Sequence, residues 1–223
     1  MNLRVATYNV HNTDGAKSIV GIADEIKSIG ADFVGLQEID VGVHRSQDKN
    51  TLGEINKICG YPSALFAKSI DYDGGEYGIG VMFSYPLVSM QKYMLPSASE
   101  PRILLKVVLE TEVGYISFFN THLSYRERTV REQQIRFISS ILEKEKRFVL
   151  TGDFNIESFD ELAAIKNARF SNGPDNPIDT FKDGGCIDNI IVSDNIDISD
   201  IILHESEFSD HNMLIADIKI NMI

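Results

Sequence analysis

Short strand-like runs alternate with helical segments along this chain, and that alternation restricts its fold more than any other feature. β-Branched and aromatic residues fill the strand-like runs. In residues 17–29, isoleucines recur at helical spacing and Gly30 follows them. No linker, low-complexity tract or proline-rich break interrupts the series. A length of 223 residues would allow one or two domains, and the uninterrupted alternation predicts one α/β domain with mixed sheets over residues 1–223.

The predicted elements cover most of the chain. Strands are expected at 3–10, 32–39, 78–84, 103–111, 115–121, 148–152, 187–192 and 213–220, and helices at 17–29, 51–59 and 129–146. The strands at 78–84, 103–111 and 115–121 are expected to be neighbours in a meander. Gly, Asp, Asn and Pro are frequent in residues 69–77 and 171–185, which predicts two surface loops.

The charge balance bears on the class of partner. The chain has 33 acidic and 21 basic residues, a net charge of −12. A protein that binds duplex DNA neutralises phosphates with Lys and Arg, so this balance disfavours a nucleic acid as the default partner. Residues 126–147 are the one locally basic segment. The excess of acid also gives no support to binding at anionic membranes.

Cysteine use and hydropathy indicate the compartment. Cys59 and Cys186 lie far apart without metal-type spacing, which predicts buried free thiols of a reducing compartment. Residues 1–11 begin a strand with no preceding apolar signal region, and no run approaches about 18 apolar residues. We therefore expect a cytoplasmic protein without integral membrane association, and we expect it to be a monomer.

Polar side chains stand where the predicted strands end or begin. Open α/β sheets place their sites at such strand ends. A single Asp or His there is usually a turn, a helix cap or a structural residue. The inference therefore depends on the whole set, which comprises Asn9, Glu38, His122, Asp153, Asn155, Asp188, Asp210 and His211.

The segments around these residues resemble the metal-dependent endonuclease/exonuclease/phosphatase superfamily. The matching blocks occur in family order along the whole chain, as TYNVH (7–11), LQEID (36–40), NTHLS (120–124), LTGDFN (150–155), CIDNIIV (186–192) and FSDHNML (208–214). Two further stretches, 37–46 and 73–87, resemble the small bacterial hydrolase branch. The resemblance implies a DNase I-like four-layer α/β sandwich, with two mixed sheets face to face and helices outside. It also implies hydrolysis of a phosphate ester with Mg²⁺ or Mn²⁺.

The resemblance also implies roles for the site residues. Glu38 is the expected principal metal ligand, joined by Asn9 and Asp210. These oxygen ligands suit a hard cation such as Mg²⁺, and a cysteine-rich or multi-histidine zinc site is absent from the sequence. Asp153 corresponds to the residue that orients and deprotonates the attacking water. Asn155 corresponds to the residue that positions phosphate and water.

Three further residues complete the implied site. His211 corresponds to the histidine that contacts the phosphoryl oxygen, and Asp188 to the carboxylate that fixes its tautomer and favours its cation. His122 takes a second position facing the phosphate. The implied reaction is in-line attack by a water that the metal and Asp153 activate, with inversion and no covalent enzyme intermediate.

The chain departs from the family pattern at two positions. Asn189 stands where an aromatic residue or His is common. His11 stands where many nuclease members carry an acid, two residues after Asn9. The site therefore holds one metal firmly, or binds a second metal through His11.

Other polar residues have two interpretations each. Arg45 grips a substrate phosphate as a bidentate fork, or is a solvated loop arginine. Arg131 and Gln134 are expected to form a structural bracket on their helix rather than part of the site. Residues 71–77 lack the spacing of a calcium loop and are expected to form a turn. Within that turn Tyr77 is expected to pack in the core, with contact to a substrate as the alternative.

The leading functional hypothesis is a Mg²⁺-dependent phosphodiesterase or phosphatase acting on a small-molecule or lipid-head-group phosphate ester. The alternative is a metal-dependent endonuclease or exonuclease on DNA or RNA, which the net charge and the absence of Trp disfavour. A non-catalytic binding module ranks last, because the site residues are all present. The same site chemistry serves monoesters and diesters, so the sequence leaves both open.

Overall fold

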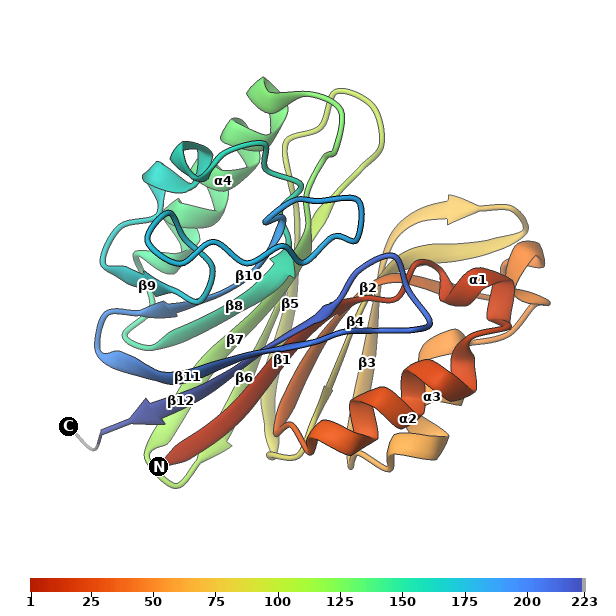
Figure 1. Cartoon of the computed structure of the whole chain (residues 1–223), viewed down its shortest axis with the longest axis horizontal. Helices are drawn as coiled ribbons and strands as arrows, with labels where there is room; N and C mark the ends of the chain where they lie inside the picture. The colour runs from red at the N-terminus through yellow and green to blue at the C-terminus, as the bar shows by residue number, and fades with distance from the viewer. Residues whose placement is uncertain (222–223) are drawn as a thin grey trace.

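Two six-stranded sheets pack face to face, with helices on both outer faces (Figure 1). This arrangement is seen in a computed structural model that describes residues 1–221. The predicted four-layer α/β sandwich of mixed sheets is therefore confirmed. Residues 222 and 223, which the predicted domain includes, lie outside the described residues.

The first sheet has the order β11-β12-β1-β2-β4-β3 and the second has the order β5-β6-β7-β8-β10-β9. The strands of the first sheet are β1 (Asn2–Asn9), β2 (Phe33–Val41), β3 (Ser63–Tyr72), β4 (Gly75–Phe83), β11 (Ile196–His204) and β12 (Met213–Ile220). Those of the second sheet are β5 (Leu87–Met94), β6 (Ile103–Thr111), β7 (Gly114–His122), β8 (Phe148–Asp153), β9 (Ala168–Phe170) and β10 (Asp188–Ser193). The helices are α1 (Thr13–Ala16), α2 (Ile19–Ile29), α3 (Thr51–Cys59) and α4 (Arg128–Leu142), with short 3₁₀ segments η1 (His44–Ser46) and η2 (Phe159–Ala164).

Within the described residues each sheet contains one parallel pair near its centre. β1 pairs with β2 in the first sheet, and β7 pairs with β8 in the second. Helix α2 follows β1 and helix α4 follows β7, so each parallel pair is joined through a helix on the outer face. The carboxyl ends of both parallel pairs therefore present their last residues at a sheet edge.

Three apolar layers hold the sandwich together. The central layer lies between the sheets, where Phe33 of β2 stacks on Phe118 of β7 with ring centroids 4.7 Å apart. A second layer lies between the first sheet and the apolar sides of α2 and α3. A third lies between the second sheet and α4. Burial of these side chains away from water is the main favourable contribution to the fold.

Buried polar side chains also join the two sheets. Asn120 of β7 donates to the carbonyl oxygens of Leu36 and Gly80, both at 2.9 Å. Its amide oxygen accepts from Gln37 Nε2 at 2.7 Å and from Thr151 Oγ1 at 3.2 Å. These bonds specify which residues face each other across the sandwich, because a shifted packing would leave buried polar groups unpaired.

The prediction of a surface loop at residues 69–77 is wrong. Strands β3 and β4 extend through this segment and form a hairpin with a tight turn at Asp73 and Gly74. Both residues have positive φ, 43° and 84°, which suits the two-residue turns that match the twist of paired strands. The aspartate and glycines thus mark a hairpin turn rather than a long loop. The second predicted loop, at 171–185, has little regular structure, as expected.

The predicted meander is also wrong in part. β6 and β7 are neighbours, but β4 belongs to the opposite sheet. Four strands were not predicted, namely β3, β5, β9 and β11. Each is a strand at the edge of a sheet. Most of their side chains are exposed or only half-buried, which weakens the apolar pattern that predicts a strand. In β5 most side chains are exposed.

Two smaller expectations can be compared with the structure. Cys59 and Cys186 are free thiols as predicted, but both are half-buried rather than buried. Among residues 1–221, no helix combines the length and the apolar character needed to cross a bilayer.

The polar link at Asn120 predicts a large stability effect. Asn120→Leu should lower the free energy of unfolding by about 3 kcal/mol or more. The buried carbonyl oxygens of Leu36 and Gly80 would lose this donor, and Gln37 Nε2 would keep only its bond to Thr7 Oγ1. Asn195→Ala is the control, since its amide makes a surface contact with the Lys146 carbonyl; its loss should be about 1 kcal/mol or less. Urea unfolding followed by circular dichroism measures both. Equal losses would contradict a linking role for Asn120.

Candidate active site

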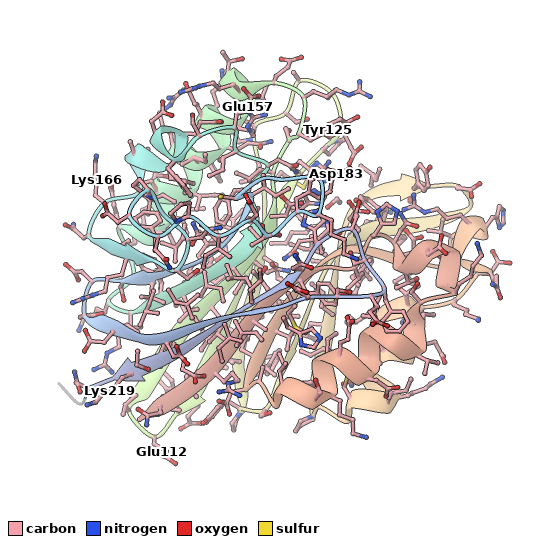
Figure 2. All side chains as sticks on the ribbon, viewed as in Figure 1. Glu112, Tyr125, Glu157, Lys166, Asp183 and Lys219 are labelled. Atoms are coloured by element: carbon pink, nitrogen blue, oxygen red, sulfur yellow. The ribbon has the colours of Figure 1, made fainter. Side chains whose placement is uncertain are left out.

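A cavity of about 380 Å³ opens at the edge where the parallel strands end. Most of the predicted site residues line it, namely Glu38, Arg45, His122, Asp153, Asn155, Asp210 and His211. Asn9 and Asp188 lie directly behind this lining and are buried. The structure therefore brings all of the predicted site residues together. Figure 2 shows Tyr125, which also lines the cavity, at the end of the molecule opposite Glu112.

Asp153 is the buried carboxylate at the centre of the site. It ends β8 and is 1% exposed. Its Oδ2 accepts from Asn9 Nδ2 at 3.0 Å and its Oδ1 accepts from the Asn155 backbone N–H at 2.9 Å. Burial, with the nearby Asp188 carboxylate, raises the pKa of Asp153 above its ordinary value, and His211 and the hydrogen bonds oppose this rise. A carboxylate with a raised pKa is a suitable proton acceptor near neutral pH.

His211 and Asp188 form a buried pair beside Asp153. His211 Nδ1 donates to Asp188 Oδ2 at 2.8 Å, and His211 Nε2 lies 3.7 Å from Asp153 Oδ2. Burial lowers the pKa of His211, but the Asp188 carboxylate more than offsets this and the pKa rises to about 10. His211 is therefore a cation at neutral pH. The ring of Phe181 covers its imidazole edge-on, with centroids 5.1 Å apart.

His122 is uncharged, unlike His211, although it lies in the same cavity. It ends β7, and its Nε2 lies 3.4 Å from Asp153 Oδ2. Burial, with the positive charges of Arg102 and His211, holds the pKa of His122 well below its ordinary value. Its Nδ1 is buried and has no hydrogen-bond partner among the described residues. His122 is thus a neutral imidazole.

Glu38 enters the cavity through a distortion of β2. The pairing of β2 with β4 shifts register between Leu36 and Ile39, and Glu38 has a φ of 62°. A bulge of this kind redirects one side chain out of the sheet pattern. The expectation that Glu38 ends its strand is therefore wrong, since β2 continues to Val41. Asn9 Nδ2 also donates to Glu38 Oε1 at 3.2 Å.

Carboxylate oxygens facing the cavity suit a hard divalent cation. Glu38 and Asp210 both line the cavity, and oxygen ligands are those that Mg²⁺ prefers. Asp210 Oδ2 lies 2.8 Å from His11 Nδ1, so His11 is also at this edge of the site. The amide oxygen of Asn9 accepts from the His11 backbone N–H, and its amino group joins Glu38 to Asp153.

A second group of possible ligand atoms is less suitable for a metal. Asp153, Asp188 and His211 offer ligand atoms within 4.8 Å of one another. However, His211 Nδ1 is already bonded to Asp188, and Asp153 already accepts from Asn9 Nδ2 and from the Asn155 backbone N–H. The donor set therefore favours Glu38 and Asp210 over this buried group.

Arg45 lines the cavity and is paired with a buried carboxylate, Asp40. Its Nε and one Nη donate to the two oxygens of Asp40 at 2.8 and 2.9 Å, and Asp40 is fully buried. The guanidinium also lies over the rings of Tyr72 and Tyr77, at 4.6 and 5.4 Å from their centroids. Arg45 is thus held in the cavity wall by its bidentate ion pair with Asp40.

Arg102 is a cavity residue that the sequence interpretation missed. It is 5% exposed, lines the cavity, and its Nε has no hydrogen-bond partner among the described residues. One Nη lies 3.2 Å from Glu100 Oε1. A positively charged guanidinium in the wall of a cavity is well placed to bind an anion. The only sequence signal was a charged residue immediately before the apolar run of β6.

Arg131 and Gln134 form the predicted bracket on α4. Arg131 is fully buried and bonds to Glu161 at 2.9 Å, to Glu157 at 2.7 Å and to the Tyr125 carbonyl at 3.1 Å. Gln134 Nε2 donates to the Pro96 carbonyl at 2.8 Å. Together they hold the loops that follow His122 and Asn155 against α4.

Comparisons with known proteins agree with this geometry. The model of the Endonuclease/Exonuclease/phosphatase family matches residues 6–211. A comparison with curated proteins found no match. Among solved structures, an endonuclease/exonuclease/phosphatase from Beutenbergia cavernae is similar with a TM-score of 0.83 and 20% identity, over 99% of this chain and 72% of that chain.

Two eukaryotic structures are also similar. TDP2 from Caenorhabditis elegans has a TM-score of 0.79 and 19% identity, over 98% of this chain and 74% of that one. The catalytic domain of human Nocturnin, solved with a bound sulfate anion, has a TM-score of 0.77 and 20% identity, over 99% of this chain and 94% of that one. At such identities these likenesses show the shared DNase I-like fold. Because the family model spans nearly the whole chain, this protein belongs to the endonuclease/exonuclease/phosphatase family, whose members hydrolyse phosphoester bonds.

Proposed function

We propose that this protein is a divalent-metal-dependent phosphodiesterase or phosphatase that acts on a phosphate ester of a small molecule or a lipid head group. The observation that carries the proposal is the contact of a buried cation with a buried carboxylate, His211 beside Asp153, in one cavity. A phosphoester anion needs a positive group for its oxygens and a base for the attacking water. These two side chains supply both within one small volume.

Asp153 is the proposed general base. Its two oxygens are oriented by Asn9 and by the Asn155 backbone, and its raised pKa suits removal of a proton from water at neutral pH. The His211 imidazolium neutralises charge on the phosphoryl oxygens, and Asp188 fixes its ring and its charge. Asn155 positions phosphate and water, and His122 supplies a second polar contact to the phosphate.

Glu38 and Asp210, with Asn9, are the proposed ligands of Mg²⁺ or Mn²⁺. Such an ion would polarise the phosphoryl group and help to orient the substrate. In the alternative with two ions, His11 would bind the second. Arg102 is the proposed additional anion-binding residue, and Arg45 contributes positive charge from the cavity wall.

The size of the cavity and the net charge of the chain support a small substrate. A volume of about 380 Å³ suits a compact head group. The net charge of −12 would repel a long polyanion. A sulfate, which has the shape and charge of a phosphate group, is bound in the related Nocturnin structure. Cleavage of DNA or RNA is the alternative function. For the compartment, the free thiols of Cys59 and Cys186 support a cytoplasmic location.

Metal removal tests the proposed chemistry. EDTA should abolish release of nitrophenol from bis(p-nitrophenyl) phosphate, and Mg²⁺ or Mn²⁺ should restore it, because the reaction needs a cation to offset phosphoryl charge. Circular dichroism should show the same fold in both states. Activity that survives chelation would contradict the mechanism. A panel of phosphomonoesters, glycerophosphodiesters, sphingomyelin and plasmid DNA then identifies the substrate class, and rapid nicking of the plasmid at physiological salt would favour the nuclease.

The role of Asp153 predicts a loss of turnover without loss of fold. Asp153→Asn should lower kcat by about 10³-fold or more, because an amide cannot accept the proton from water. Glu112→Gln is the matched control, since Glu112 is exposed at the end of the molecule away from Tyr125 (Figure 2). It should leave kcat unchanged. Turnover of Asp153→Asn close to that of the control would remove Asp153 from its role.

The role of Arg102 predicts a loss of substrate affinity. Arg102→Gln should raise KM by about tenfold or more, with a smaller effect on kcat, because a charged hydrogen bond to the anion is lost. Arg136→Gln replaces an exposed arginine on α4 and should leave KM unchanged. Steady-state kinetics on bis(p-nitrophenyl) phosphate measure both. The same KM in both variants would exclude Arg102 from substrate binding.

A further inference from the structure

The loop that carries Asp210 and His211 has almost no regular structure. It joins β11 to β12, and residues 205–212 form only bends and one isolated bridge. On one side it contacts the 171–185 loop, where the Lys182 backbone N–H donates to the Asp210 carbonyl. That loop is itself irregular. The position of His211 must therefore be fixed by other contacts, because no continuous strand ladder or helix does so.

Glu25 of helix α2 contacts this loop through a buried carboxylate. The residue is 9% exposed. Its Oε1 accepts from the Glu207 backbone N–H at 3.0 Å, and its Oε2 accepts from Ser206 Oγ at 2.9 Å and from Tyr8 OH at 2.8 Å. A buried carboxylate is costly unless donors satisfy it, and here two of the three donors belong to the loop. Glu25 therefore favours one path for this loop.

Ser206 extends the contact toward the cavity. Its Oγ accepts from the backbone N–H groups of Phe208 and Ser209 at 2.9 and 3.1 Å. Ser209 Oγ in turn donates to the Asn9 carbonyl at 2.7 Å and accepts from the His211 backbone N–H at 3.2 Å. A continuous series of hydrogen bonds thus connects Glu25 to His211 and to the end of β1.

A second contact lies one helical turn away on α2. The ring of Phe208 packs directly over Gly21, where an added Cβ would lie 2.5 Å from three ring atoms. Gly21 and Glu25 are four residues apart and so share one face of the helix. This face therefore holds the loop at two points, by packing at Phe208 and by hydrogen bonds at Ser206 and Glu207.

We propose that Glu25 is a positioning residue for the candidate active site, acting through Ser206. It holds the 205–212 loop so that His211 lies between Asp188 and Asp153 and Asp210 lies at the cavity. The inference rests on the proposed function for the role of His211 in turnover. A displacement of a reacting group by about 1 Å costs about a hundredfold in rate, so loss of this support should lower kcat more than it changes KM.

The test compares two buried serines that undergo the same change. Ser206→Ala breaks the series, whereas Ser139→Ala removes a hydroxyl of similar burial on α4, which donates to the Ala164 carbonyl at 2.7 Å. With bis(p-nitrophenyl) phosphate and Mg²⁺, Ser206→Ala should lower kcat by about tenfold to a hundredfold with KM within about threefold. Ser139→Ala should leave both unchanged. Ser206→Thr restores the hydroxyl and should return most of the lost kcat.

A second variant acts without removing a hydrogen-bonding group. Gly21→Ala places a methyl group against the Phe208 ring and should also lower kcat with little effect on KM. This variant keeps the test decisive if Ser206→Ala does not fold. If Ser206→Ala and Gly21→Ala fold and have the same kcat as Ser139→Ala, the proposal is overturned. This holds whether that shared kcat equals the wild-type value or lies below it.

NMR spectroscopy separates this inference from the proposed function. The Nδ1 proton of His211, assigned with His211→Gln, reports its bond to Asp188 without any turnover. It should shift or broaden in Ser206→Ala and Gly21→Ala and stay unchanged in Ser139→Ala. If the wild-type protein hydrolyses none of the phosphate esters, the proposed function fails, and this resonance still decides whether α2 positions His211. An unchanged resonance in both loop variants would overturn the proposal.

Discussion

The hydrogen bond from Asn9 Nδ2 to Asp153 Oδ2 joins the two sheets at the point where their parallel strands end, and the candidate site depends on it. Asn9 is the last residue of β1 and Asp153 the last of β8. The bond is possible only because the two sheets pack in one register, which the polar contacts of Asn120 and the stacked rings of Phe33 and Phe118 support. The fold therefore positions the site directly, since the residues that join the two sheets lie beside the residues that line the cavity.

The charges in this small volume follow from which group each side chain faces. His211 and His122 are both buried within 4 Å of the same Asp153 oxygen. His211 has Asp188 behind it and is a cation, whereas His122 has Arg102 beside it and is neutral. Burial lowers the pKa of both imidazoles, and only in His211 does a neighbouring carboxylate, Asp188, more than offset it. This difference places one positive ring and one neutral ring beside the Asp153 carboxylate.

Much of this could be predicted from the sequence, and the exceptions share physical reasons. The residues at the ends of buried central strands, such as Asn9 and Asp153, were predicted because those strands have strong apolar patterns. The edge strands β3, β5, β9 and β11 were missed because no apolar face is fully covered there. The bulge that turns Glu38 into the cavity has no local signature in LQEID. The sequence pattern therefore predicts a strand that ends at residue 39, whereas β2 continues to Val41. Arg102 was missed because its burial and its unpaired Nε depend on contacts made only after folding.

The same reasoning explains why the helix layer takes part in the site. Asn9, His122 and Asp153 end regular strands, and the ladders of the two sheets fix their backbones. Asp210 and His211 lie in an irregular loop, where no ladder is available. A charged carboxylate on α2 is a costly way to fill a buried position, and an apolar side chain would pack there at lower cost. An apolar side chain could not accept from Ser206 Oγ or the Glu207 backbone, however. The presence of Glu25 at this position is therefore accounted for by the loop that it holds rather than by the stability of the helix.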